Sequence, residues 1–331
     1  MSDFTEFHDE LRSIAGDLLV KRTRGAQTGG DASWPALVDA GWVGLEVPEE
    51  LGGAGATFAE TAVICEEIGR AAAATSYLGS AVLTVATLNA LEPSDTRDRL
   101  LAEVACGQTR LAVALESLDF VPDADGADAI LFVVNGAVAV AELETRPTPV
   151  VDETRSLATV SSRADEPPTV LRFAGDPDTA VRRLHDRAAV AIACDSLGLS
   201  QAMLDATVAY TKVRHQFGRA IGSFQAVKHA CADMLVSIAV SRQLVRDAVT
   251  AIAEDSSEAG VAAAMAKSHT CAAAVDIAGK AMQLHGGIGY TWESGIHVYL
   301  KRATLNRSLF GSPTALRSRL AHRYRTADQG V

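Results

Sequence analysis

Hydrophobic residues recur at helical spacing through the first third of the chain. From Asp3 to about residue 113, Leu, Val, Ile and Ala return every three or four positions, which is the pattern of amphipathic helices. The segment 42–57, WVGLEVPEELGGAGAT, breaks this pattern, because Pro48 blocks a helix and the glycines permit turns. Another helix is expected from about Phe58 to Arg70. We therefore predict an N-terminal helical domain over residues 1–113.

The pattern changes near residue 114. Short runs typical of β-strands, LAVALES, AILFVV and AVAVAEL, are separated by Asp, Gly and Pro clusters such as PDADGAD and RPTPVVDE. This spacing predicts a small β domain over residues 114–175.

Helical periodicity returns at Asp176, which can cap a helix that has Pro177 at its first position. Helices are expected over 176–214, 223–254, 257–284 and 312–324, the last with Ser312 as its cap and Pro313 following. Long helices with short joints predict an antiparallel four-helix bundle over residues 176–331. The fold class is therefore mainly α. The apolar faces of these helices exceed what one bundle can cover, so we expect an oligomer.

Composition narrows the class of protein. The 331 residues are 48% hydrophobic and carry 30 basic against 41 acidic side chains, a formal net charge of -11. This acidic balance argues against nucleic acid and anionic membranes as partners. The N-terminus lacks the pattern of a signal peptide, and no apolar run reaches the roughly 18 residues of a membrane span, so a cytoplasmic protein is expected. Five scattered cysteines predict buried, reduced thiols.

Common catalytic signatures are absent from the sequence. It contains no phosphate-binding loop of the G-x-x-x-x-G-K-[ST] type, no dinucleotide G-x-G-x-x-G fingerprint, no H-E-x-x-H and no G-x-S-x-G. The eight histidines are scattered without metal-ligand spacing, so no metal site is predicted.

Two segments are candidates for ligand binding. The first is RHQFGRAIGSFQ, residues 214–225, where a helix end, a glycine turn and a new helix start could seat a phosphate beside Arg214. The second is QLHGGIGY, residues 283–290, where Gly286 and Gly287 would let a flat ring or a pyrophosphate approach the backbone beside Gln283. Taken alone, the first segment favours a helix corner with a surface arginine over a phosphate seat, and the second is also typical of a glycine cap at a helix end.

Together with VPEELGGAG, these strings resemble the acyl-CoA dehydrogenase family in content, order and spacing. The family's patterns are V-P-E-E-x-G-G-x-G, R-x-x-F-G-x-x-I-x-x-F-Q and Q-x-x-G-G-x-G-[YF]. The resemblance covers roughly residues 30–75 and 176–325.

The resemblance implies a helical domain, a β domain and a C-terminal bundle, usually in a tetramer with FAD at a dimer interface. The reaction is α,β-dehydrogenation of an acyl-CoA thioester, in which a carboxylate removes the α-proton and the flavin accepts hydride. In such proteins the matching residues of one subunit hold the nucleotide end of FAD in its neighbour. Carried over, these cofactor-binding residues are Arg214, Gln216, Phe217, Phe224, Gln225, Gln283, Gly286 and Gly287.

The departures from the family concern the catalytic base. The family's Glu lies about 27 residues after the motif glutamine, where this chain has Phe310, and an alternative position ten residues before the string GLSQ is Ala188. Nearby, Asp186 faces away on a helix, and Asp195 lies roughly 10 Å along the helix axis. We therefore predict no catalytic residue in this chain.

The β domain also departs from the family. Relatives carry a T-E-P-x-A-G-S-D-like strand and a W-I-T-N-like strand against the flavin ring; here only ALE, residues 114–116, resembles the first. The chain thus resembles the reduced subunit of heteromeric bacterial steroid side-chain acyl-CoA dehydrogenases. The hypothesis is an α2β2 heterotetramer in which a catalytic partner of the same family binds most of the acyl-CoA and this chain completes a shared FAD site.

Two alternatives stay open at this stage. One is an independent homomeric dehydrogenase with a displaced base such as Glu116 or Glu293. The other is a scaffold or regulatory homologue that binds no flavin.

Overall fold

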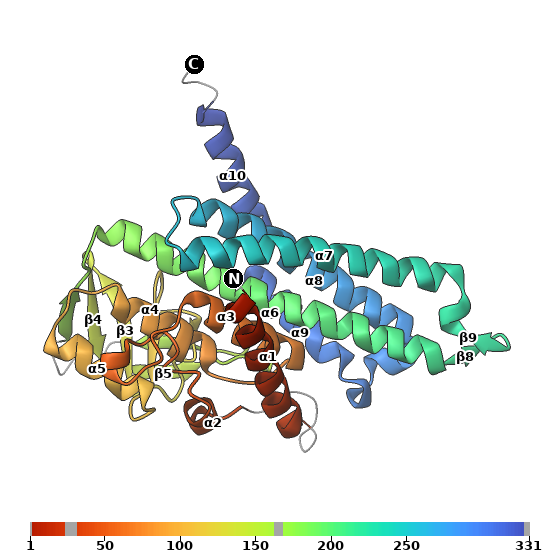
Figure 1. Cartoon of the computed structure of the whole chain (residues 1–331), viewed down its shortest axis with the longest axis horizontal. Coiled ribbons are helices and arrows are strands. Elements are labelled where there is room, and N and C mark those ends of the chain that lie inside the picture. Colours follow the sequence, from red (N-terminus) through yellow and green to blue (C-terminus); the bar gives the residue numbers. More distant parts are fainter. Residues whose placement is uncertain (1, 24–31, 162–167, 328–331) are drawn as a thin grey trace. The chain divides into compact units, whose positions relative to one another are not determined.

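The computed structural model describes residues 2–23, 32–161 and 168–327 (Figure 1). The chain forms two compact units. The first contains residues 1–31, 65–73 and 189–331, and the second contains residues 32–64 and 74–188. The fold is mainly helical with a small β region in the middle of the sequence, which confirms the predicted fold class.

Short helices make up the first half of the second unit. They are α2 (Trp34–Asp39), η1 (Glu49–Leu51), the start of α3 (Phe58–Ala71), the π-helix η2 (Leu78–Leu83), α4 (Thr84–Asn89) and α5 (Asp95–Ala105). The VPEELGGAG segment folds back on itself, because the Gly55 N–H donates to the Val47 carbonyl at 2.9 Å. Gly53 is required there, since an added Cβ would lie 2.0 Å from the same carbonyl oxygen.

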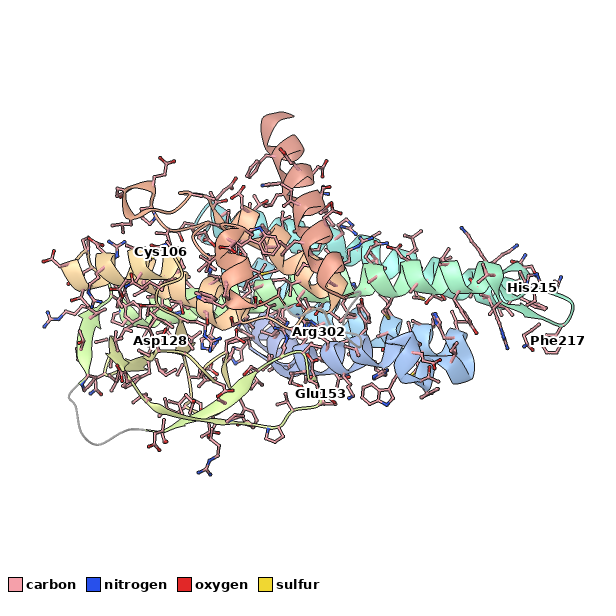
Figure 2. The ribbon with its side chains drawn as sticks, turned by 90° about the horizontal axis from the view of Figure 1, so that it is seen from below. Cys106, Asp128, Glu153, His215, Phe217 and Arg302 are labelled. Atoms are coloured by element: carbon pink, nitrogen blue, oxygen red, sulfur yellow. The ribbon has the colours of Figure 1, made fainter. Side chains whose placement is uncertain are left out.

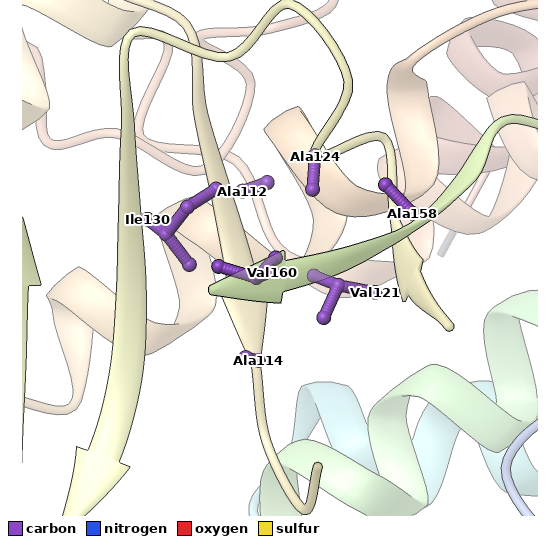
Figure 3. Packing of buried hydrophobic residues seen from close by; sticks show 7 residues of the cluster. All are labelled: Ala112, Ala114, Val121, Ala124, Ile130, Ala158 and Val160. Carbon is purple, nitrogen blue, oxygen red and sulfur yellow. The ribbon is translucent and has the colours of Figure 1, made fainter. Parts of the chain in front are cut away.

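Within its described residues, the second unit also contains seven short strands. They are β1 (Leu111–Ala114), β2 (Val121–Pro122), β3 (Ala129–Val134), β4 (Ala137–Ala141), β5 (Glu144–Pro147), β6 (Leu157–Ser161) and β7 (Thr169–Arg172). One sheet has the order β1-β3-β4-β7, with β1 parallel to β3 and the other pairs antiparallel; the other sheet has the order β2-β6-β5. The two sheets share a core of small apolar side chains (Figure 3): Ala112, Ala114, Val121, Ala124, Ile130, Ala158 and Val160.

Long helices build the first unit. They are α1 (Ser2–Thr23), the larger part of α6 (Pro177–Val213), α7 (Gln225–Ala253), α8 (Ala259–His285), α9 (Ile296–Ser308) and α10 (Pro313–Ala327). Helix α8 packs against α7, α9 and α10. The two predicted caps are present, since the Asp176 carboxylate accepts the Thr179 N–H at 2.9 Å and the Ser312 hydroxyl accepts the Ala315 N–H at 3.2 Å.

Helices α3 and α6 approach each other backbone to backbone through two glycines. An added Cβ on Gly69 would lie 1.9 Å from the Asp195 carbonyl oxygen, and one on Gly198 would lie 1.8 Å from the Glu66 carbonyl oxygen. No side chain fits between the helices at this crossing. Glycine is needed here for space, although it weakens a helix interior.

Several details were not anticipated. Helix α9 lies in a segment for which no helix was predicted, and residues 215–220 form a β-hairpin rather than a simple turn. Among the cysteines, Cys65, Cys194 and Cys271 are buried, but Cys106 is exposed and Cys231 is partly exposed, so burial was predicted too broadly. Within the described residues, no helix is both long enough and apolar enough to cross a membrane.

Candidate functional site

The first candidate segment follows the C-terminus of α6 and forms a tight hairpin. Strand β8 (His215–Gln216) pairs with β9 (Arg219–Ala220), and the Ile221 N–H donates to the Arg214 carbonyl at 2.8 Å. The two loop residues, Phe217 and Gly218, have φ of 54° and 77°. Positive φ at both positions is the geometry of a type I′ turn, which glycine adopts freely and phenylalanine does not. The hairpin therefore holds Phe217 in a strained backbone.

Two phenylalanines and an arginine of this segment pack against one another. The rings of Phe217 and Phe224 meet edge to face with centroids 6.1 Å apart, and the Arg219 guanidinium lies 4.0 Å from the Phe224 ring centroid. Phe217 is nevertheless 90% exposed at the tip of the hairpin (Figure 2). An exposed phenyl ring that is held in place can contact a ligand or a partner chain.

The new helix α7 starts directly after this aromatic pair. Phe224 occupies the N-cap position without a side-chain capping bond, and Gln225, the first residue of the helix, is exposed. Arg214 and Gln216 are also exposed. A guanidinium close in sequence to the N-terminus of a 29-residue helix gives this end of the bundle two positive features that suit a phosphate.

The second candidate segment ends α8. Gln283 is exposed on its last turn, and the Gly286 N–H donates to the Gln283 carbonyl. Gly286 has φ 61° and ψ −142°, a backbone conformation that is essentially restricted to glycine. A Cβ added at Gly286 or Gly287 would meet nothing within 4 Å. The backbone of this turn is therefore open to close approach by a ligand.

A direct contact joins the two segments. Tyr210 lies on the last turn of α6, and His285 is the last residue of α8. The Tyr210 hydroxyl donates to the His285 carbonyl at 3.3 Å, and the two rings stack with centroids 4.4 Å apart and planes 21° from parallel. The structure therefore brings the two motifs to the same end of the helical unit.

The positions of the family's base carry no carboxylate. Phe310 lies in the turn between α9 and α10 with φ 51°, followed by Gly311 with φ 99°. The buried Lys267 ammonium fixes this turn by donating to the Asn306 carbonyl at 2.7 Å and the Gly311 carbonyl at 3.3 Å. The alternative position, Ala188, is fully buried. Neither position can accept a proton.

The carboxylates considered as replacements differ in their surroundings. Asp195 is buried and bound to Arg302, with an Oδ2–Nη2 distance of 2.6 Å. Glu116 is exposed and lies 3.1 Å from His185 Nε2, and Glu293 is exposed in η5 (Trp292–Ser294). Among the described residues, no group of three or more His, Cys, Asp or Glu side chains could hold a metal ion.

Three residues of this site were not predicted from the sequence. Tyr210 and His285 link the motifs, and Arg219 supports Phe224. Tyr210 is four residues before Arg214, so it lies on the same helix face one turn earlier, which is the signal that could have identified it. His285 stands inside the second motif, between Gln283 and Gly286, and Arg219 lies within the first.

Residues 3–108 match the N-terminal domain of acyl-CoA dehydrogenases, and residues 179–324 match the C-terminal domain. The chain belongs to the acyl-CoA dehydrogenase family.

Relatives of known name and structure agree with this assignment. The chain is 36% identical over 309 residues to acyl-CoA dehydrogenase IpdE2 of Mycobacterium tuberculosis, covering 92% of this chain and 91% of that protein. It superimposes on a steroid ACAD, the Tcur3481-Tcur3483 G363A variant, with a TM-score of 0.86, 25% identity and coverage of 98% and 99% of the two chains. The ChsE4-ChsE5 complex of Mycobacterium tuberculosis shares the fold, with a TM-score of 0.83, 22% identity and coverage of 96% and 97%.

Proposed function

We propose that this chain is the non-catalytic subunit of a heteromeric, FAD-dependent acyl-CoA dehydrogenase. In this proposal it supplies the nucleotide half-site, defined as Arg214, Gln216, Phe217, Phe224, Gln225, Gln283, Gly286 and Gly287. A catalytic partner of the same family supplies the flavin-ring contacts, most of the acyl-CoA groove and the base. The observation that carries the proposal is an open, preorganised half-site in a chain without a carboxylate at either base position.

The half-site fits the adenosine and pyrophosphate end of FAD. The exposed Arg214 guanidinium can donate two parallel hydrogen bonds to a phosphate, and the open flank of Gly286 and Gly287 leaves room for the ligand beside the Gln283 amide. Phe217 and Phe224 can cover a flat ring. When bound, FAD supplies the hydride acceptor for dehydrogenation, while these residues bind and orient its nucleotide end.

The missing base supports a division of labour between two chains. Removal of an α-proton needs a group of matched pKa within hydrogen-bond reach of the substrate. Phe310 and Ala188 offer none, and the Asp195 carboxylate is already bound by Arg302 and Asn306. The proton acceptor therefore comes from the partner.

The relatives support the partner and the substrate class. The similar Tcur3481-Tcur3483 protein is a steroid ACAD whose name has two parts. By analogy, we propose an α2β2 assembly in the cytoplasm that dehydrogenates a bulky CoA thioester, with a sterol side-chain intermediate as the substrate class.

Co-expression with the catalytic subunit tests the proposal. The chain alone is expected to purify without stoichiometric FAD and to reduce no electron acceptor with any acyl-CoA, whereas the complex is expected to contain flavin and be active. Arg214→Ala in the complex is expected to lower its flavin content, because the guanidinium is lost from the phosphate seat.

Two results would replace the proposal. Stoichiometric flavin and activity in the chain alone, abolished by Glu116→Gln or Glu293→Gln, would establish a homomeric enzyme with a displaced base. Flavin content that is unchanged by both Arg214→Ala and Gln283→Ala would favour a scaffold that does not contact the cofactor.

A further inference from the structure

We infer that Tyr210 and His285 are positioning residues that hold the two halves of the nucleotide half-site in register. The inference rests on the proposed function, but it concerns residues outside the motifs' ligand-binding positions. Neither side chain needs to touch FAD. Their role is to fix the distance between the hairpin that follows α6 and the glycine turn that follows α8.

On the α6 side, Tyr210 is tied to Arg214 through the backbone. The Arg214 N–H donates to the Tyr210 carbonyl at 2.9 Å, and this bond closes the last turn of the helix. The Arg214 carbonyl in turn accepts the Ile221 N–H at 2.8 Å, which closes the hairpin. A shift of Tyr210 therefore moves Arg214 and the base of the hairpin with it.

On the α8 side, His285 directly precedes the glycine turn. Its side chain is 8% exposed, and its Nδ1 lies 2.8 Å from the Ala281 carbonyl oxygen. A carbonyl oxygen can only accept, so Nδ1 carries the proton and the ring orientation is set. The ring then stacks on Tyr210, whose hydroxyl donates to the His285 carbonyl. That carbonyl belongs to the peptide that joins His285 to Gly286.

The glycine turn also packs against α9, and its Gly289 carbonyl accepts a hydrogen bond from the Ser294 hydroxyl at 3.3 Å, but these contacts do not involve α6. Nothing lies within 4 Å of a Cβ built on Gly286 or Gly287, so their open flank gives no lateral support. On the other flank, a Cβ on Gly289 would lie 2.7 Å from the Met282 carbonyl, so the turn packs back on α8 itself. Both of these features belong to α8 and its turn, whereas the Tyr210–His285 contact connects the turn to α6.

Hydrogen exchange on the chain alone tests the positioning role without a partner. The informative amides are those of Gly286, Thr291 and Ile221, which are hydrogen-bonded to the carbonyls of Gln283, Ile288 and Arg214. Tyr210→Leu is expected to speed exchange at these amides about tenfold, as for the loss of about 1.4 kcal/mol of local stability. Tyr210→Phe keeps the stacked ring and should have a smaller effect.

Tyr299→Leu is the matched control. The Tyr299 hydroxyl also donates to a backbone carbonyl, that of Arg70 at 3.0 Å, within the same unit but from α9 to α3. Tyr299→Leu should leave hydrogen exchange at the amides of Gly286, Thr291 and Ile221 unchanged. Equal effects of Tyr210→Leu and Tyr299→Leu on these amides would overturn the inference, because the effect would then be general destabilisation.

The dissociation constant of FAD in the co-expressed complex is the second readout. Tyr210→Leu and His285→Leu each remove one ring of the stack and are expected to weaken FAD binding about fivefold to tenfold. Tyr210→Phe should stay close to the unmodified chain, and Tyr299→Leu should be unchanged. If Tyr210→Leu does not fold, His285→Leu carries the test against Tyr299→Leu.

The two proposals fail in different ways. If Arg214→Ala weakens FAD binding while Tyr210→Leu and His285→Leu leave it within twofold, the positioning role is wrong and the proposed function stands. If Arg214→Ala and Gln283→Ala also leave FAD binding unchanged, the proposed function itself is wrong.

Discussion

Arg302 and Asp195, which are 107 residues apart in the sequence, form a buried ion pair. The guanidinium donates from Nη2 to Asp195 Oδ2 at 2.6 Å and from Nε to Oδ1 at 3.0 Å, and the two side chains are 0% and 4% exposed. Asn306 Nδ2 donates to the same carboxylate at 2.7 Å, and Arg302 Nη1 donates to the Ala73 carbonyl at 3.1 Å. The pair thus links α9 to α6 and to the segment that follows α3.

Removing either partner of this pair should destabilise the chain strongly. Asp195→Asn or Arg302→Met leaves a buried charge uncompensated, so we expect a loss of about 3–5 kcal/mol in the free energy of unfolding. Urea denaturation measures this loss in the free energy of unfolding. The control is Asp205→Asn, because Asp205 pairs with Arg70 at 2.9 Å with both side chains about half exposed, and such pairs contribute roughly 0–1 kcal/mol. Similar losses at the two pairs would contradict this prediction.

Glu67 should make the stability depend on pH. Burial is the main cause that raises the pKa of Glu67 from 4.5 to about 6, and the neighbouring Glu66 is the second. The Arg12 guanidinium, 3.6 Å away, acts in the opposite direction and lowers this pKa. The folded chain then binds more protons than the unfolded chain between these values. The free energy of unfolding should therefore fall by up to about 2 kcal/mol as the pH rises from about 4.5 to above 6.

Glu67→Gln should remove most of this decline, because the amide stays neutral at every pH. Denaturation midpoints measured between pH 4 and 7.5 show the slope directly. Glu50→Gln, at an exposed carboxylate in η1, is the control and should retain the decline. A Glu67→Gln chain with the original slope would mean that another group is responsible.

The helix crossing at Gly198 should not tolerate alanine. The new methyl group would lie 1.8 Å from the Glu66 carbonyl oxygen, so α3 and α6 must move apart. We expect a loss of about 3 kcal/mol or more, as for a severe overpacking change. Gly279→Ala in α8 is the matched control, because nothing lies within 4 Å of that Cβ and alanine favours a helix by about 1 kcal/mol. Thermal unfolding should show opposite signs for the two variants.

Phe217→Gly should separate stability from cofactor binding. The ring is 90% exposed and the residue has φ 54°, so glycine relieves backbone strain and removes little buried surface. The chain alone should keep its stability to within about 1 kcal/mol. In the complex, by contrast, flavin retention should fall because the covering ring is lost.

Phe120→Gly provides the matched control for this variant. Phe120 has φ 57° and is 55% exposed, but it lies in the β region. Its replacement should leave both stability and flavin retention nearly unchanged. If the Phe217→Gly complex retains flavin as firmly as the Phe120→Gly complex, Phe217 does not belong to the half-site.

The sequence predicted those features of the fold that depend on neighbouring residues. The caps at Asp176 and Ser312 and the helices that follow them were predicted, because the cap, the proline and the first turn are adjacent. Helix α9 was missed, since its apolar periodicity is interrupted by polar residues such as Arg302 and Asn306, whose side chains are buried and bonded to Asp195. That bond depends on contacts across more than 100 residues.

In the candidate site, too, features that depend on neighbouring residues could be predicted and features that depend on distant contacts could not. The motif strings drew attention to Arg214, Gln283 and the glycines, whose roles toward FAD stay predictions. The positive φ of Phe217 and the stacking of Tyr210 on His285 could not be predicted, because both follow from how the chain closes at the end of the unit.

The order in which the chain visits its two units restricts how it can be dissected. Residues 65–73 belong with 1–31 and 189–331, while their flanks, 32–64 and 74–188, belong to the other unit. The polypeptide therefore passes between the units four times. No single cut in the gene can release either one intact, and a fragment ending anywhere before residue 189 would lack most of the long helices around which the first unit is built.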